Sequence, residues 1–203
     1  MEQNQRKRPY TRVITRIAIL SAVATVLMAL KAPLWFTPPF YKMEISEAAV
    51  LIGAFALGPS AGVVIELIKV LLNFLIDGTV TAGVGELANF IMGCSFILPA
   101  ALIYKFNKSI RSAVIGMIAG IISLIVVSSL LNYYLLLPLY GKVFGIPMES
   151  LVKMGTEKNP SITDIKTFIL LAVVPFNLIK GLLSSVITFL LYKRISPILH
   201  VRD

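Results

Sequence analysis

The sequence predicts an all-α integral membrane protein of about six helices, one of them short and broken. Two observations predict this fold class. Hydrophobic residues make up 57% of the 203 positions and charged residues only 14%, whereas a soluble domain carries about 25% charged residues. The apolar residues also form runs of about 18 or more, which is the length that a helix needs to cross a bilayer core of about 30 Å.

The first helix is expected at about 12–31. Basic residues precede it, as they precede a signal peptide, but its apolar part is longer than the roughly 7–15 residues of such a segment, and no Ala-x-Ala site follows. The helix is therefore predicted to be retained. The next stretch, APLWFTPPFYKMEIS, contains three prolines, which exclude a regular helix.

The remaining helices are predicted at about 47–57, 61–76, 85–104, 113–137 and 165–192. The first of them is too short to cross the bilayer alone, and Gly58-Pro59-Ser60 ends it. The long apolar run before Pro138 is expected to stop at that proline. The polar stretch 140–164 is predicted to be a loop with some helical content. No repeat or low-complexity segment divides the chain, so residues 1–203 are predicted to form a single transmembrane domain.

Charged residues predict the orientation. With six crossings and the N-terminus inside, most basic residues fall on the cytoplasmic side, as the positive-inside rule requires. These residues are Arg6, Lys7, Arg8, Arg12, Arg16, Lys105, Lys108, Arg111, Lys193, Arg194 and Arg202. The outer side receives the other lysines of the loops together with Glu44, Glu47 and Glu86. The tails 1–11 and 194–203 are therefore expected in the cytoplasm.

Composition and motifs exclude several classes of function. The net charge of +9 could indicate nucleic acid, but the basic residues stand at the ends of apolar runs without aromatic residues between them. We therefore expect membrane lipid as a partner and no nucleic acid. The sequence contains no G-x-x-x-x-G-K-[ST], G-x-S-x-G or H-E-x-x-H. One cysteine and one histidine cannot form a His/Cys metal cluster, so we expect no enzyme, no cofactor and no metal site.

Polar residues at membrane depth are informative, because burying one is costly unless it is paired. Glu66 and Lys69 lie three residues apart and share one helix face. Two interpretations stay open: a neutralising pair that fixes this helix to its neighbours, or an ion or proton relay. The relay is disfavoured because no further acid or histidine is expected at this depth.

A second set of polar residues is expected in the outer half of the membrane. Asn132 stands near the end of its helix, and it is equally consistent with a hydrogen bond between helices. Asn177 and Lys180 lie three apart on the last helix, just after Pro175, which frees backbone carbonyls there. Their amide and ammonium groups suit a heterocycle that carries carbonyl and N–H groups, although Lys180 could instead pair with Glu86 or another carboxylate.

Two further places in the sequence carry weaker signals. Gly85 and Glu86 open the helix at 85–104, where glycine lets a ligand approach the backbone and the helix presents unpaired N–H groups. A turn with an acid that complements the helix dipole explains the same residues equally well. Ala18 and Ala22 lie four apart on the first helix and form a smooth strip that another helix can approach closely.

Five stretches of the sequence form a familiar series: PPFYKMEISEAAVLIGAFALGPSAGVV, IKVLLNFL, VGELANFIMG, LLNYYLLLPLYG and VPFNLIKG. Their order resembles that of the riboflavin-binding S components of energy-coupling-factor (ECF) transporters. The resemblance covers roughly residues 12–195, and the last two stretches are the specific ones. It implies a six-helix S component in a bacterial cell membrane, with both termini in the cytoplasm and a vitamin pocket that faces outward. The long polar loop 149–164 has no counterpart in it.

The resemblance also implies roles for single residues. Asn132, Asn177 and Lys180 match flavin-contacting positions, and Gly85 lies where a helix backbone approaches the ligand. The same pocket is expected to include Tyr41, Met43, Glu86 and Asn89. Ala18 and Ala22 resemble the motif that docks the first helix on a transmembrane scaffold subunit, which works with two ATPases. Such a partnership agrees with the missing ATP-binding motif.

The implied function is capture of riboflavin at the outer face of the membrane and its delivery for ATP-driven uptake. Riboflavin is then a transported ligand and not a cofactor. Two alternatives stay open at this point. One keeps the architecture with another vitamin, and the other is a stand-alone secondary transporter coupled to protons through Glu66.

Overall fold

The structure is a computed structural model that describes residues 2–79, 83–145 and 147–199, with side chains for 10–79, 83–143, 145 and 147–192. Its helices are α1 (Glu2–Ala29), α2 (Ser46–Leu57), α3 (Pro59–Asp77), α4 (Val84–Phe106), α5 (Ile110–Leu131), α6 (Leu137–Phe144), α7 (Met148–Thr156), α8 (Ile165–Phe168) and α9 (Val174–Leu199). Two π-helical turns, η1 (Asn132–Leu136) and η2 (Ile169–Val173), join α5 to α6 and α8 to α9. Each junction therefore continues one long helix.

Among the described residues, five segments are long and apolar enough to cross a membrane: Tyr10–Ala29, Pro59–Asp77, Val84–Phe106, Ile110–Val143 and Ile165–Tyr192. The sixth helix of the bundle is the shorter apolar α2. Outward-facing side chains of the bundle stay apolar, and Leu75 and Ile118, for example, are 75% and 53% exposed. Soluble proteins rarely expose so much contiguous apolar surface. The predicted all-α membrane fold, with its short second helix, is confirmed.

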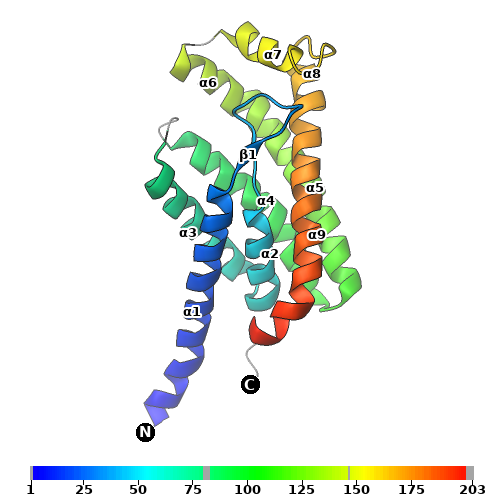
Figure 1. Cartoon of the computed structure of the whole chain (residues 1–203). Coiled ribbons are helices and arrows are strands. Elements are labelled where there is room, and N and C mark those ends of the chain that lie inside the picture. Colours follow the sequence, from blue (N-terminus) through cyan, green and yellow to red (C-terminus); the bar gives the residue numbers. More distant parts are fainter. Residues whose placement is uncertain (1, 80–82, 146, 200–203) are drawn as a thin grey trace.

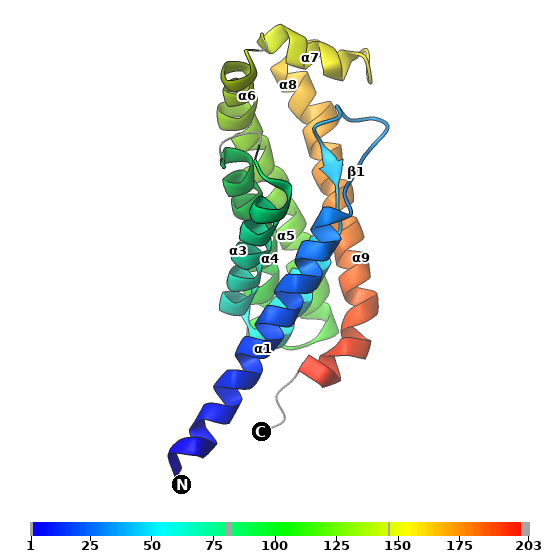
Figure 2. The ribbon, with the colours of Figure 1, turned by 60° about the vertical axis from the view of Figure 1, so that its left-hand side comes forward.

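The helices run up and down along one axis, so the bundle has two distinct ends (Figure 1). Both termini and the α4–α5 connection lie at one end. The other end, which we call the cap end, carries the loop 30–45, α6 and α7, and α7 lies over α8 there (Figure 2). The loop contains a small antiparallel sheet of β1 (Ala32–Pro33) and β2 (Lys42–Met43), in which Ala32 pairs with Met43.

Three helix ends differ from the predictions by several residues. α1 begins at Glu2, well before the predicted start at residue 12, and α9 ends at Leu199, beyond the predicted end at residue 192. The helix expected to stop at Pro138 continues to Phe144, because the π turn η1 directly precedes this proline. A π turn shifts the register of the backbone hydrogen bonds, so the missing N–H of a proline in the following turn is tolerated. The same arrangement recurs at η2 and Pro175.

Close backbone packing holds α4 against α5. Gly116 and Gly120 of α5 face the carbonyl oxygens of Ala100 and Phe96, and a Cβ added at either glycine would overlap these atoms. Lipid offers helices no hydrophobic gain on association, so small residues that allow close contact are the common solution. The neighbouring core consists of fully buried apolar side chains, among them Leu51 and Ile97.

Replacing Gly120 by valine should lower stability by about 1–3 kcal/mol, because the new side chain overpacks the α4–α5 contact. The measurement is thermal melting of the purified protein in detergent. Val126→Ile is the control, since Val126 lies on the same helix but is 52% exposed. A Gly120→Val protein that melts with the wild type would contradict the close approach of the two helices.

Candidate functional site

Five charged side chains meet inside the bundle, and we call this group the charge cluster: Glu44, Glu47, Glu66, Lys69 and Lys180. The Lys180 Nζ lies 2.7 Å from a Glu44 oxygen and 3.6 Å from Glu47 Oε1. The Lys69 Nζ lies 3.0 Å from Glu47 Oε1 and 2.7 Å from Glu66 Oε2. Acids and lysines thus alternate along a continuous chain of contacts that joins the loop, α2, α3 and α9.

The charge cluster corrects one sequence prediction and adds to another. Glu44 and Glu47, which were assigned to the outer side of the membrane, are buried in the bundle and only 5% and 1% exposed. The expectation that no further acid would accompany Glu66 is therefore wrong, although its predicted pairing with Lys69 is present. A signal existed in the sequence, because two lysines at membrane depth require more than one acidic partner.

Lys180 pairs with Glu44 and not with Glu86, which instead accepts a hydrogen bond from Thr79 Oγ1 at 3.1 Å. The second Glu44 oxygen accepts from the Ser46 backbone N–H at 2.6 Å. Burial alone raises the pKa of Glu44, but the Lys180 and Lys69 ammonium groups outweigh it and lower this pKa to about 2. Glu44 is therefore charged at neutral pH.

Tyr41 of the loop lies in an aromatic slot at the cap end. Its ring centroid is 4.8 Å from that of Phe40, 5.4 Å from that of Phe176 and 6.3 Å from that of Phe168. The Tyr41 hydroxyl donates a hydrogen bond to Asn132 Oδ1. Burial raises the pKa of Tyr41 well above its ordinary value, so the phenol stays protonated as a donor.

Both predicted asparagines lie beside a π turn. Asn132 is the first residue of η1, and its Nδ2 donates to the Ser128 carbonyl at 2.8 Å. Asn177 follows η2, and its Nδ2 donates to the carbonyl of Val173, the last residue of that turn, at 2.9 Å. These side chains are 2% and 4% exposed. Because π turns are frequent at functional sites, their position beside both amides marks this region as a candidate site.

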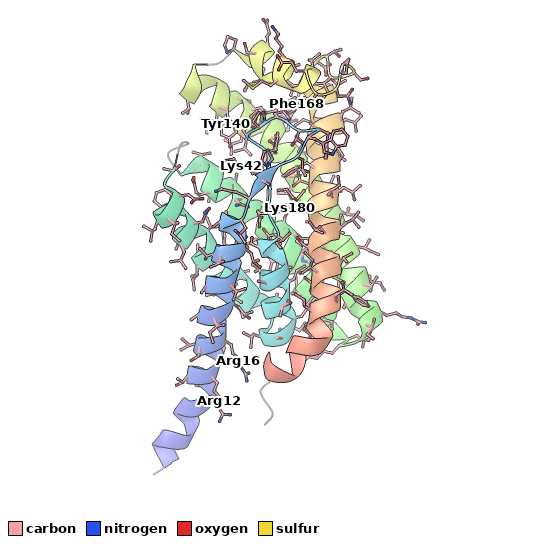
Figure 3. All side chains as sticks on the ribbon, in the orientation of Figure 1. Arg12, Arg16, Lys42, Tyr140, Phe168 and Lys180 are labelled. Atoms are coloured by element: carbon pink, nitrogen blue, oxygen red, sulfur yellow. The ribbon has the colours of Figure 1, made fainter. Side chains whose placement is uncertain are left out.

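The other predicted residues also lie toward the cap end. Met43 is half-buried on β2, and Gly85, Glu86 and Asn89 are half-buried in the first turns of α4. Glu86 lies near enough to Tyr140 to act on it electrostatically. Figure 3 shows Lys42, Tyr140, Phe168 and Lys180 toward this end, whereas Arg12 and Arg16 lie toward the termini.

Tyr41, Asn132, Asn177 and Lys180 are packed against the protein's own groups. A cavity of about 520 Å³ does lie nearby, between α7, the start of α8 and Tyr133. Its volume is in the range of small-molecule sites, but none of the eight predicted ligand contacts lines it. In the structure Tyr41 is hydrogen-bonded to Asn132 and Glu44 is paired with Lys180. We call this state of the four residues the closed arrangement.

Ala18 and Ala22 are exposed on α1, on the side turned away from the bundle. The neighbouring Ser21 and Thr25 are buried, and their hydroxyls donate to the carbonyls of Ile17 and Ser21 within the same helix. The predicted small-residue strip is therefore accessible to another helix.

Comparisons with known proteins agree with this architecture. The family described as "ECF transporter, substrate-specific component" matches residues 12–192. The chain is 38% identical to the riboflavin transporter RibU of Staphylococcus aureus (strain TCH60), with 98% of this chain and 94% of that protein covered. It is 32% identical to the riboflavin transporter FmnP of Bacillus subtilis (strain 168), with 89% of this chain and 90% of that protein covered. A solved structure of the S component of a bacterial ECF transporter is similar, with a TM-score of 0.73, 35% identity and coverage of 94% of this chain and 98% of that one.

Lys180→Met should lower the melting temperature without any ligand, because it leaves the buried charge of Glu44 without its lysine, at a cost of about 3 kcal/mol. The double variant Lys180→Met/Glu44→Gln should recover part of this loss, since both charges are then removed. Lys153→Met, at an exposed position of α7, serves as the control. A double variant that melts no higher than Lys180→Met would refute the coupling between the two residues.

Proposed function

The chain belongs to the substrate-specific components of ECF transporters, and on this premise we propose that it captures riboflavin at the outer face of a bacterial cell membrane for ATP-driven uptake. The observation that carries the proposal is the combination, at one end of the bundle, of an aromatic slot with the amides of Asn132 and Asn177 and the ammonium of Lys180. The similarity to two named riboflavin transporters supports the choice of this vitamin.

The chemistry of this region suits a flavin. A flavin ring system is flat, with two apolar faces that can stack on aromatic side chains such as Phe168 and Phe176. Its edge carries carbonyl oxygens, ring nitrogens and an N–H group. Amide side chains offer both a donor and an acceptor to such an edge, and an ammonium group offers three donors.

Capture of the ligand requires the closed arrangement to open. Tyr41 occupies the aromatic slot and bonds Asn132, while Glu44 holds Lys180. Both tethering residues belong to the same segment that connects α1 to α2. We infer that movement of this segment releases Asn132 and Lys180 together, and that riboflavin takes the place of the Tyr41 ring.

The family also bears on the partners and the orientation. We propose that a transmembrane scaffold subunit and two ATPases act with this chain, and that α1 docks on the scaffold through Ala18 and Ala22. The exposure of these two residues supports this assignment. We also propose that both termini are cytoplasmic, which the basic residues near them support. This proposal takes the place of the alternative hypothesis from the sequence, a stand-alone secondary transporter.

Titration of the purified protein with riboflavin tests the proposed function. A ligand of about 27 heavy atoms contributes roughly 0.3 kcal/mol per atom, which corresponds to a Kd of about 1 μM or tighter. Stacking on aromatic rings should quench flavin fluorescence. The absence of quenching up to about 100 μM riboflavin would refute the assignment. Saturable binding of another vitamin would favour an S component for that vitamin.

In the same titration Asn177→Ala should weaken riboflavin binding by roughly 5- to 150-fold, because a lost hydrogen bond to a buried group costs about 1–3 kcal/mol. Asn107→Ala is the matched control, since Asn107 is exposed at the opposite end of the bundle. Equal affinities of the two variants would remove Asn177 from the binding site.

Ala22→Leu should abolish riboflavin uptake by cells while leaving binding by the purified protein unchanged. The branched side chain would hold a docking helix away from α1, and Ala22 does not face the bundle. Val186→Leu, at a position of α9 that is 54% exposed, controls for bulk on the lipid-facing surface. Parallel loss of binding and uptake would assign Ala22 to internal packing.

A further inference from the structure

The charge cluster contains three carboxylates but only two ammonium groups, so its fixed charges do not balance. All five side chains are buried: Lys69 and Glu66 are fully buried, Glu47 is 2% exposed, and Glu44 and Lys180 are 5% and 11% exposed. They lie within an apolar bundle, where an uncompensated charge is strongly disfavoured. One unit of negative charge therefore requires compensation.

The three carboxylates differ in how well they are compensated. Glu44 has Lys180 at 2.7 Å and the Ser46 N–H at 2.6 Å. Glu47 has both lysines near one oxygen, at 3.0 Å and 3.6 Å. Glu66 has Lys69 alone, at 2.7 Å from Oε2, and its Oε1 is buried without a hydrogen-bond partner among the described residues. Three other oxygens of the cluster also lack a hydrogen bond: Glu44 Oε1, Glu66 Oε2 and Glu47 Oε2. Glu44 Oε1 and Glu66 Oε2 each lie 2.7 Å from a lysine Nζ, and Glu47 is paired with two cations.

We propose that the charge cluster binds one proton, carried by the Glu66 carboxyl group, so that its buried charges sum to zero. The geometry at Glu66 suits a neutral acid. Oε2 remains the acceptor that faces Lys69, and Oε1 is the oxygen that can carry the hydrogen. The same carboxyl group lies against Gly93 of α4, where a Cβ would overlap it. The glycine therefore provides the space in which an acid is accommodated inside the membrane.

The groups that face Glu66 are consistent with this assignment. Glu47 acts on it from α2 and Lys69 from its own helix, and the Cys94 thiol is the titratable group of α4 beside it. Lys180 acts from α9 at longer range. α1, which also packs on α3, presents the buried hydroxyls of Ser21 and Thr25, and these are bonded to their own helix backbone.

The proton belongs to the charge balance of the whole cluster. If Glu47 lost its charge, the remaining acids Glu44 and Glu66 would face two lysines, and an ionised Glu66 would then balance Lys69. Glu47→Gln should therefore release the proton from Glu66, although this substitution leaves Glu66 itself unchanged. A cluster of this kind balances charge, which is a different role from the proton relay considered from the sequence.

Infrared spectroscopy of the purified chain in lipid nanodiscs at neutral pH tests the proposal, because a protonated carboxyl group has a carbonyl band that an ionised carboxylate lacks. We expect this band, with its shift in D2O, in the wild type and its loss in Glu66→Gln. We expect the same loss in Glu47→Gln. Glu149→Gln, which changes an exposed acid of α7, should retain the band.

Thermal melting provides a second readout. Glu66→Gln and Glu47→Gln should each melt close to the wild type, since each single variant stays neutral. The double variant should melt clearly lower, since it leaves one lysine unbalanced. A wild type without the band, or a band that persists in Glu66→Gln, would overturn the assignment to Glu66. A band that persists in Glu47→Gln would refute the proposal that the charge balance of the whole cluster holds the proton. Glu47→Gln tests the proposal even if Glu66→Gln does not fold.

Discussion

The alternating contacts from Glu66 through Lys69, Glu47 and Lys180 to Glu44 are the constraint on which the rest of the structure depends. An isolated charge in an apolar bundle is costly, so each of these side chains must lie where its neighbour can reach it. The contacts fix α2, α3 and α9 relative to one another and attach the segment before α2 to α9. The short helix α2 is thereby held within the bundle, although it is too short to span a membrane by itself.

This constraint also explains how the candidate site is built. Lys180 takes part in the charge cluster, and Asn177 lies nearly one helical turn before it on α9. The same segment that supplies Glu44 supplies Tyr41, which reaches Asn132 on the other long helix. The proposed ligand contacts and the structural ion pairs are therefore parts of one network, and the region proposed for recognition also packs the bundle.

The sequence predicted the fold well because the length of an apolar run determines whether a helix crosses a bilayer. It failed where the determinant was non-local. The continuation of the helix past Pro138 depends on a π turn, which apolar periodicity does not reveal. The burial of Glu44 and Glu47 depends on lysines that lie far along the chain. The contact between Tyr41 and Asn132 joins residues 91 positions apart, which no spacing rule connects. Asn177, Lys180 and Asn132 could be singled out as candidates because a polar residue in an apolar run is conspicuous by itself.

Tyr41 and Glu44 lie only three residues apart, and this proximity has a kinetic consequence. A segment fastened at two adjacent points detaches from both in a single cooperative step, because freeing one anchor while the other holds gains little room. The rate at which a ligand enters is then limited by the lifetime of the fastened state and not by diffusion. Uptake of the ligand into the site would therefore level off at high ligand concentration, at the rate at which the segment opens.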